Sequence, residues 1–235
     1  MGNDSHCKIL LNGSISEAVV GKPGYYYEAS RGGEHEFTFT TAGHSYPTLD
    51  SSIKKFGDSS WHFPSSGGDI GILVSGPDTS DWNVTSDDFT IDLWQYGSNG
   101  TVTPNIFIAG VYLDASNYWG IKYTVAGTPN VLSLNFTVKV AGTTLLDINY
   151  PYTIDANVFA HTAIVKQGST ITMYLDGTAM TSGTLATIPT INSDFRIGTF
   201  CGGSCSDSIF HIDEFRYSKG IARWITDFEP PNRAN

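Results

Sequence analysis

The sequence AHTAIVKQGSTITMYLDG, residues 160–177, contains the clearest fold signal of this chain. Two runs of apolar and β-branched residues, 160–166 and 170–175, stand on either side of Gln167-Gly168-Ser169, and such residues favour strands. A three-residue connection that contains glycine is typical of a β-hairpin. Asp176-Gly177, which follows the second run, is a preferred pair for tight turns with positive backbone φ. This stretch therefore predicts two antiparallel strands followed at once by another turn.

The same pattern recurs along the chain, with short runs of strand-forming residues between clusters of Gly, Pro, Asn, Asp and Ser. We expect further strands at 8–11, 36–41, 60–63, 89–94, 106–113, 118–125, 132–140, 144–149, 195–199 and 210–217. A short helix is expected only near Gly220–Trp224. Many strands with hairpin-sized connections predict an all-β fold, an antiparallel two-sheet sandwich or jelly roll. No linker divides the chain, so we interpret residues 1–235 as one domain.

Composition and charge narrow the functional classes. The chain has 235 residues, of which 40% are hydrophobic and 15% charged, with 23 acidic against 13 basic residues and a net charge of -10. A chain of this sign has no general attraction for nucleic acid or anionic membranes. No apolar run approaches the roughly 18 residues of a membrane helix. Residues 1–10 lack the charged and apolar regions of a signal peptide, so we expect synthesis in the cytoplasm without one.

Several segments in this order resemble a known family. They are 161–166 and 172–177, then Phe195–Gly198, Ile212–Trp224 and Phe228–Pro231, preceded by Lys8–Gly13, Lys54–Ser60 and Asp88–Trp94. Together they are similar to the laminin-G-like, concanavalin A-like jelly-roll modules common in phage virion and tail proteins. The sequence departs from the family at Asn12, where an acidic residue is usual, in the stretch Tyr25–Arg31 and in the loop Cys201–Cys205.

The resemblance implies a function as well as a fold. We expect a non-enzymatic virion surface protein of a tailed phage, either a capsid decoration protein or a tail-associated adhesion module. Its partners would be other capsid or tail proteins and host-surface glycans, and it would form homo-oligomers at the virion surface after synthesis in the host cytoplasm. The first alternative is a carbohydrate-binding lectin module.

The second alternative is a glycoside hydrolase, because the same superfamily includes such enzymes. Retaining glycosidases need two carboxylates about 5–5.5 Å apart, and Glu-x-Asp-x-Glu on one strand would supply them on one face. No such pattern occurs, and Glu34-His35-Glu36 is the nearest approach. We therefore interpret the chain as a protein that is not an enzyme.

Aromatic residues in predicted loops are the candidate ligand-binding residues. Trp82 and the run Tyr25, Tyr26 and Tyr27 lie outside the expected strands. Aromatic faces stack on sugars because the C–H face of a sugar ring is apolar, although most aromatic residues of a sandwich fill its core. These four residues are therefore expected to contact a glycan or a protein partner.

Asp213 is the candidate metal ligand. The resemblance implies that an acidic residue on this strand helps to bind a structural calcium ion, and carboxylate oxygens are ligands that calcium prefers. The alternative is a turn-facing or salt-bridged side chain, paired with Arg216. Asn12 stands where a second anionic partner would be expected.

Cys201 and Cys205 are separated by three residues, while Cys7 stands alone. The close pair forms either a local disulfide or two free thiols. A disulfide requires Cα atoms within about 7 Å, which a hairpin loop would allow. We expect this disulfide in the extracellular particle.

Overall fold

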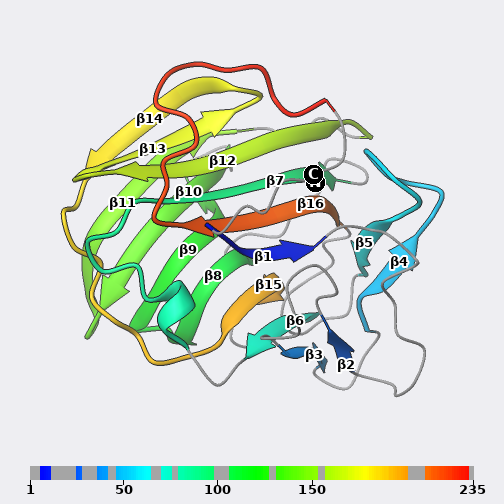
Figure 1. The fold of residues 1–235 in the computed structure, drawn as a ribbon, viewed down its shortest axis with the longest axis horizontal. Helices are drawn as coiled ribbons and strands as arrows, with labels where there is room; N and C mark the ends of the chain where they lie inside the picture. Colours follow the sequence, from blue (N-terminus) through cyan, green and yellow to red (C-terminus); the bar gives the residue numbers. More distant parts are fainter. Residues whose placement is uncertain are drawn as a thin grey trace.

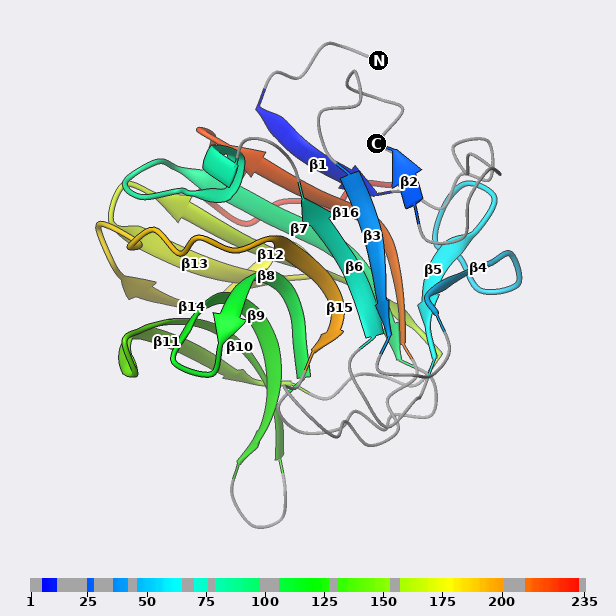
Figure 2. The same cartoon turned by 90° about the horizontal axis from the view of Figure 1, so that it is seen from below.

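The computed structural model describes residues 6–11, 25–27, 36–41, 46–64, 70–75, 79–97, 106–126, 131–152, 157–200 and 210–232. These residues form sixteen β-strands and one short 3-10 helix, Thr79–Trp82. The strands make two eight-stranded sheets that face each other, and all strand pairs are antiparallel (Figures 1 and 2). The predicted jelly-roll sandwich is therefore confirmed.

Sheet A is built around the long strands near its centre. In spatial order it contains β14 (Thr178–Thr184), β13 (Thr170–Leu175), β12 (Phe159–Gln167), β7 (Phe89–Gly97), β16 (Phe210–Lys219), β5 (Ser60–Phe63) and β4 (Thr48–Asp50). Its eighth strand, β1 (Cys7–Leu11), also pairs with β16, farther along that strand than β5 does. One flank of β16 is thus shared by two short strands.

Sheet B has a simple linear order. It contains β11 (Thr143–Pro151), β10 (Val131–Val140), β9 (Asn117–Ala126), β8 (Ile106–Asp114), β15 (Phe195–Phe200), β6 (Ile70–Ser75), β3 (Glu36–Thr41) and β2 (Tyr25–Tyr27). Strands β8 to β11 follow one another as hairpins, whereas β15 joins the sheet from a distant part of the sequence. Sheet B therefore combines strands from distant parts of the chain in one layer.

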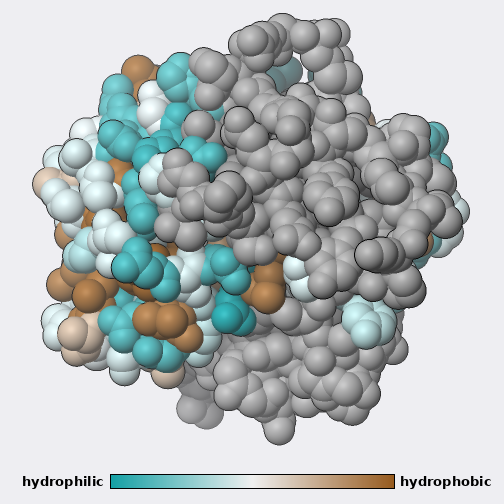
Figure 3. Space-filling model, turned by 60° about the horizontal axis from the view of Figure 1, so that its bottom comes forward, coloured by the Kyte–Doolittle hydropathy of each residue, from teal (hydrophilic) through white to brown (hydrophobic). Residues whose placement is uncertain are grey.

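The core lies between the sheets and follows the two-residue period of the strands. On β7, Phe89, Ile91 and Leu93 point inward and are at most 1% exposed. The intervening Asp92 and Trp94 point to the outer face of sheet A. Outside the core, hydrophobic side chains on the described surface of one side of the molecule are interspersed with hydrophilic ones (Figure 3).

A C-terminal segment, residues 220–232, lies across the outer face of sheet A (Figure 1). We call it the strap. Trp224 and Phe228 stack on each other with ring centroids 4.0 Å apart, and they pack on Tyr174 of β13 and on neighbouring small residues of β12. The Phe228 amide donates to the Gly177 carbonyl. A Cβ atom at Gly177 would lie 1.8 Å from the Phe228 oxygen, so glycine allows this close approach.

The strand predictions agree well with the structure, with two kinds of exception. Each segment expected to be a strand contains one, and Glu36–Thr41, Ser60–Phe63 and Thr170–Leu175 have the predicted bounds. Strands β2, β4, β6 and β14 were not predicted. The expected helix at Gly220–Trp224 is wrong, because this segment is irregular and its partly buried Ala222 and Trp224 pack against sheet A. Among the described residues, no helix is long and apolar enough to cross a lipid bilayer.

Candidate functional site

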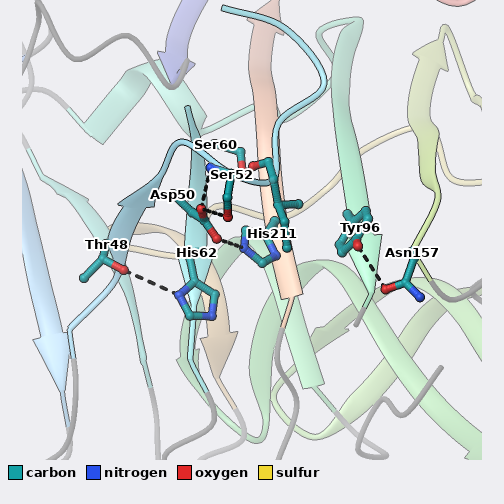
Figure 4. Close-up of polar contacts among 9 residues, drawn as sticks. Thr48, Asp50, Ser52, Ser60, His62, Tyr96, Asn157 and His211 are labelled. Carbon is teal, nitrogen blue, oxygen red and sulfur yellow. Dashed lines mark hydrogen bonds and ion pairs between the residues drawn. The ribbon is translucent and has the colours of Figure 1, made fainter. Parts of the chain in front are cut away.

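A group of polar and aromatic side chains gathers at one end of the outer face of sheet A (Figure 4). It comes from β4, β5, β7 and β16 and from the residues that lead into β12. We call it the histidine cluster. Its members are Thr48, Asp50, Ser52, His62, Tyr96, Asn157, Phe159 and His211.

Strand alternation places the two histidines on the same face. Trp61 and Phe63 flank His62 on β5 and are buried in the core, so His62 points outward. His211 is flanked in the same way by buried core residues of β16. The two histidines are register partners across the β5–β16 pair. Their rings stack with centroids 4.6 Å apart and an interplanar angle of 19°.

Asp50 holds His211 in place. Its Oδ2 atom lies 3.1 Å from Nε2 of His211. Its Oδ1 atom accepts hydrogen bonds from the Ser52 backbone amide at 2.7 Å and from the Ser52 hydroxyl at 2.5 Å. The Ser52 hydroxyl is the main reason that the pKa of Asp50 lies well below its ordinary value. The carboxylate is therefore ionised and can accept from an N–H group at Nε2 of His211.

Burial lowers the pKa of both histidines, and the negative charge of Asp50 opposes the shift. Both rings are therefore neutral at neutral pH. With a proton on Nε2 of His211, Nδ1 is an acceptor, and this atom is buried without a hydrogen-bond partner. A buried polar atom without a partner costs about 1–3 kcal/mol, so its presence in the cluster calls for an explanation.

Two aromatic rings extend the cluster toward β12. Tyr96 packs its ring edge-on against His211 at 5.5 Å and lies 5.0 Å from the ring of Phe159. The Tyr96 hydroxyl donates to Oδ1 of Asn157 at 2.9 Å. Asn157 is exposed and has a positive φ of 64°. Its amide nitrogen points away from Tyr96 (Figure 4), which leaves two N–H donors for another group.

Asp213 supports the cluster from behind. Its Oδ2 atom accepts from the backbone amides of Lys55 and Phe56 at 2.8 and 3.0 Å, and Oδ1 accepts from Glu214 at 2.9 Å. The side chain is fully buried, and burial raises its pKa. Asp213 thus fixes the loop between β4 and β5, which carries Ser52.

The carboxylate oxygens of Asp213 are engaged with backbone donors, and its assignment as a calcium ligand stays a prediction. The alternative of a turn-facing side chain agrees with these hydrogen bonds, and Arg216 pairs with Asp92. Among the described residues, no group of three or more His, Cys, Asp or Glu side chains could hold a metal ion. Calcium binding by the chain stays a prediction.

Trp82 does not lie in an exposed loop, and the ligand role of Tyr25, Tyr26 and Tyr27 stays a prediction. Trp82 belongs to the 3-10 helix and is fully buried, and its indole N–H donates to the Ser193 carbonyl at 2.8 Å. Its role as a ligand residue is corrected, because the ring packs near Phe195 in the core. Tyr25, Tyr26 and Tyr27 form the edge strand β2, paired with β3, rather than a loop. Cys201 and Cys205 lie outside the described residues.

The histidine cluster was not predicted from the sequence. A signal was present, since His62 in Ser-Trp-His-Phe and His211 in Phe-His-Ile each stand between large apolar residues of a strand. Such a histidine must point to the face opposite the core. Only the pairing of β5 with β16 brings the two together.

Comparison with known proteins adds a family and a set of similar structures. Residues 66–220 match the family described as the concanavalin A-like lectin/glucanases superfamily. No curated protein matches the chain at a significant level. The chain is similar to the binding domain of botulinum neurotoxin DC in complex with SialylT, with 17% identity, a TM-score of 0.62, and coverage of 91% of this chain and 48% of that chain.

Two further solved structures show the same likeness. The botulinum neurotoxin DC binding domain in complex with rat synaptotagmin II has 16% identity and a TM-score of 0.61, with 91% of this chain and 48% of that chain covered. The third describes cell entry of botulinum neurotoxin type C as dependent upon interaction with two ganglioside molecules. It has 16% identity and a TM-score of 0.62, with 91% and 47% covered. The chain spans about half the length of these proteins, and the likeness establishes the fold.

Proposed function

The chain belongs to the concanavalin A-like lectin/glucanases superfamily, and on that premise we propose that it is a non-enzymatic module that binds a glycan at the histidine cluster. One observation carries the proposal. Aromatic rings and polar groups that suit a sugar lie side by side on one end of an outer sheet face (Figure 4).

The cluster offers both kinds of contact that a sugar ring needs. Hydroxyl groups of sugars donate and accept, and a carboxylate has about four lone-pair sites, so Asp50 can accept from a hydroxyl besides His211. Asn157, which is exposed, supplies amide donors. Tyr96 and Phe159 are half-buried rings whose exposed parts suit the apolar C–H face of a sugar.

The charge pattern favours binding over glycoside hydrolysis. Hydrolysis uses two carboxyl groups, about 5–5.5 Å apart in retaining enzymes and about 6.5–9.5 Å apart in inverting ones. Among its described members, the histidine cluster has Asp50 as its single carboxylate, and that group is held by Ser52 and His211. A lone, strongly ionised carboxylate suits hydrogen bonding to hydroxyls and not proton donation to a leaving group.

The similar solved structures are consistent with this ligand class. One of them concerns interaction with two ganglioside molecules, and another concerns a protein receptor, rat synaptotagmin II. The first supports a glycan as the ligand. The second supports a protein partner as the other candidate.

The biological setting is the finer part of the proposal. We propose that the module is displayed on the surface of a tailed-phage virion, where it joins other capsid or tail proteins as a homo-oligomer and presents the histidine cluster to host-surface glycans. This setting rests on the family resemblance of the sequence motifs. Mass spectrometry of purified particles would test it, since a virion component must be present at a fixed copy number.

The glycan proposal is tested by a glycan array followed by calorimetric titration of the best neutral ligand. Asn157→Gly removes the amide and keeps the positive φ that glycine adopts freely, and His62→Ala removes one ring of the stack. We expect each substitution to weaken binding roughly tenfold, the loss of one good polar contact. His6→Ala, a histidine beside the opposite end of β16, is the matched control and should bind normally. An array without ligands, or binding unaffected by both substitutions, would overturn the proposal.

A further inference from the structure

A second group of side chains with binding character lies on the outer face of sheet B. Core residues on β8, β9 and β15 identify this face by alternation, because Val111, Trp119 and Phe195 point inward. Their neighbours therefore point outward. We call these outward residues the tyrosine–cation array. Its members are Phe107, Tyr112, Tyr118, Lys122, Lys139 and Arg196.

Two glycines form the floor of the array. Gly110 of β8 is the register partner of Gly120 on β9 and of Arg196 on β15. A Cβ atom on Gly120 would come within 2.6 Å of the Phe107 ring, so the missing side chains leave room for that ring to lie over the sheet. Phe107 then contacts Tyr112 and Tyr118 with ring centroids 5.6 and 6.3 Å away. Phe107 is buried, so the half-buried rings of Tyr112 and Tyr118 form the accessible part of this platform of three aromatic rings.

Cations surround this platform. The Arg196 guanidinium lies 5.5 Å from the centre of the Tyr112 ring, and Nζ of Lys122 lies 5.4 Å from the centre of the Tyr118 ring. The Lys122 ammonium also donates to the Tyr118 hydroxyl at 3.2 Å. Lys139 is the register partner of Tyr118 on the next strand. Three of the 13 basic residues of an acidic chain thus share one face.

Two carboxylates lie near the array. Asp147 of β11 accepts a hydrogen bond from Thr137 at 2.7 Å and is directed toward that residue and Asn135. Asp194 stands two residues before Arg196, and burial raises its pKa while Arg196 opposes the shift. In the array, cations flank two half-buried tyrosine rings.

From these contacts we propose that the tyrosine–cation array binds an acidic oligosaccharide, with the sugar rings on the tyrosines and the sugar carboxylates paired with Arg196, Lys122 and Lys139. The size agrees with a short ligand. Three strand spacings of about 4.8 Å separate β15 from β10, so the array spans about 14 Å, the length of about three sugar units. The site lies on the opposite sheet from the histidine cluster and does not depend on it.

The test uses calorimetric titration of the whole chain with trigalacturonate and with its carboxyl-reduced, neutral counterpart. We expect the acidic trisaccharide to bind at least about tenfold more tightly, since a hydrogen bond to a charged group is worth about one decade of affinity. The affinity should also fall several-fold as the ionic strength rises from low to physiological salt, because exposed charges are screened.

Variants then locate the site. Arg196→Gln with Lys122→Gln should remove the preference for the acidic ligand, whereas Lys54→Gln, an exposed lysine in the loop between β4 and β5, should not. Asn157→Gly should also leave it unchanged, which separates this site from the histidine cluster. Three results would overturn the proposal: equal affinity for both trisaccharides, salt-independent binding by the unaltered chain, or tighter binding of a thymidine decanucleotide. The first two need no variant and hold even where the double substitution prevents folding.

Discussion

The outer face of sheet A carries two aspartate–histidine pairs, one beneath the strap and one outside it. At one end Asp50 lies beside His211, with 3.1 Å between Oδ2 and Nε2. In the middle of the same face, Asp92 lies beside His161, with 3.5 Å between the corresponding atoms. The strap covers the second pair, whereas the first lies beyond it, next to half-exposed aromatic rings.

The covered pair is enclosed by Arg216 and by the aromatic rings of the strap, although both ring nitrogens of His161 are buried without a hydrogen-bond partner. Arg216 binds both oxygens of Asp92 with its Nε and Nη2 atoms at 2.9 and 3.0 Å. His161 is fully buried, and its ring meets Trp224 and Phe228 edge-on. The aspartate–histidine pair beneath the strap is therefore closed off from solvent, while the pair outside the strap lies beside the exposed Asn157 and the half-buried ring of Tyr96.

The largest expected effect comes from breaking the covered pair. Asp92→Ala would leave the Arg216 guanidinium without its carboxylate in a largely buried position, and loss of one partner of a buried pair costs about 3–5 kcal/mol. Urea denaturation monitored by tryptophan fluorescence would measure the free energy of unfolding. Asp58→Ala, which removes an exposed carboxylate, is the control and should change it by less than about 0.5 kcal/mol. A small loss for Asp92→Ala would contradict the structural role.

The strap itself provides the next largest effect. Phe228→Ala removes the stack on Trp224 and the contacts with Tyr174 and His161. Because Phe228 is half-buried, we expect a loss of about 2–3 kcal/mol, at or below the low end for phenylalanine truncation in a core. Ile225→Ala is the matched control within the strap, since Ile225 is 60% exposed. Equal losses for the two variants would mean that the strap does not pack as described.

A third prediction concerns Asp213, which fixes the loop behind the histidine cluster. Asp213→Asn replaces one acceptor oxygen with an N–H donor that faces backbone amides, so we expect a loss of about 1–3 kcal/mol. The measurement is thermal unfolding with calcium and with a chelator. The loss should be the same in both conditions, because the carboxylate binds backbone donors. A difference that appears only with calcium would support the metal-ligand interpretation.

The sequence predicted the parts of this structure that depend on local pattern. Strand β13 was predicted with its observed bounds because apolar and polar residues alternate along it. Strand β6 was missed because Ile70–Ser75 is a nearly continuous apolar run in the middle of sheet B, where alternation is lost. The strap was mistaken for a helix because its apolar residues find their partners on sheet A and not along their own segment.

The candidate site was not predicted because it depends on pairing between distant segments. Asp50, Tyr96 and His211 meet only when β4 and β5 join β16 and when β16 joins β7. Trp82 was wrongly expected to contact a ligand, because it lies between predicted strands. Its side chain points into the core instead, where the indole N–H donates to the Ser193 carbonyl. Local pattern identifies strands, whereas register determines which outward residues become neighbours.

The smallest expected effect is the dependence of stability on pH that His62 and His211 of the histidine cluster cause. His62 and His211 have a lower pKa in the folded chain than the ordinary value of 6.5. As the pH falls below 6.5, the unfolded chain therefore takes up protons first, and the folded state loses stability until its own histidines titrate. Stability should be fully present above about pH 7 and should decline toward pH 5, with a slope of at most about 1.4 kcal/mol per pH unit for each histidine.

The double substitution His62→Gln with His211→Gln should flatten this decline, as measured by urea denaturation at pH 7, 6 and 5. Thr48→Ala keeps both imidazoles and should retain the slope of the unaltered chain. Asp50 does not interfere, because its lowered pKa acts only as the pH falls below the ordinary value of 3.8. An unchanged slope in the double variant would show that the pH response arises elsewhere, and the stacked histidines would then be a neutral surface feature rather than a desolvated pair.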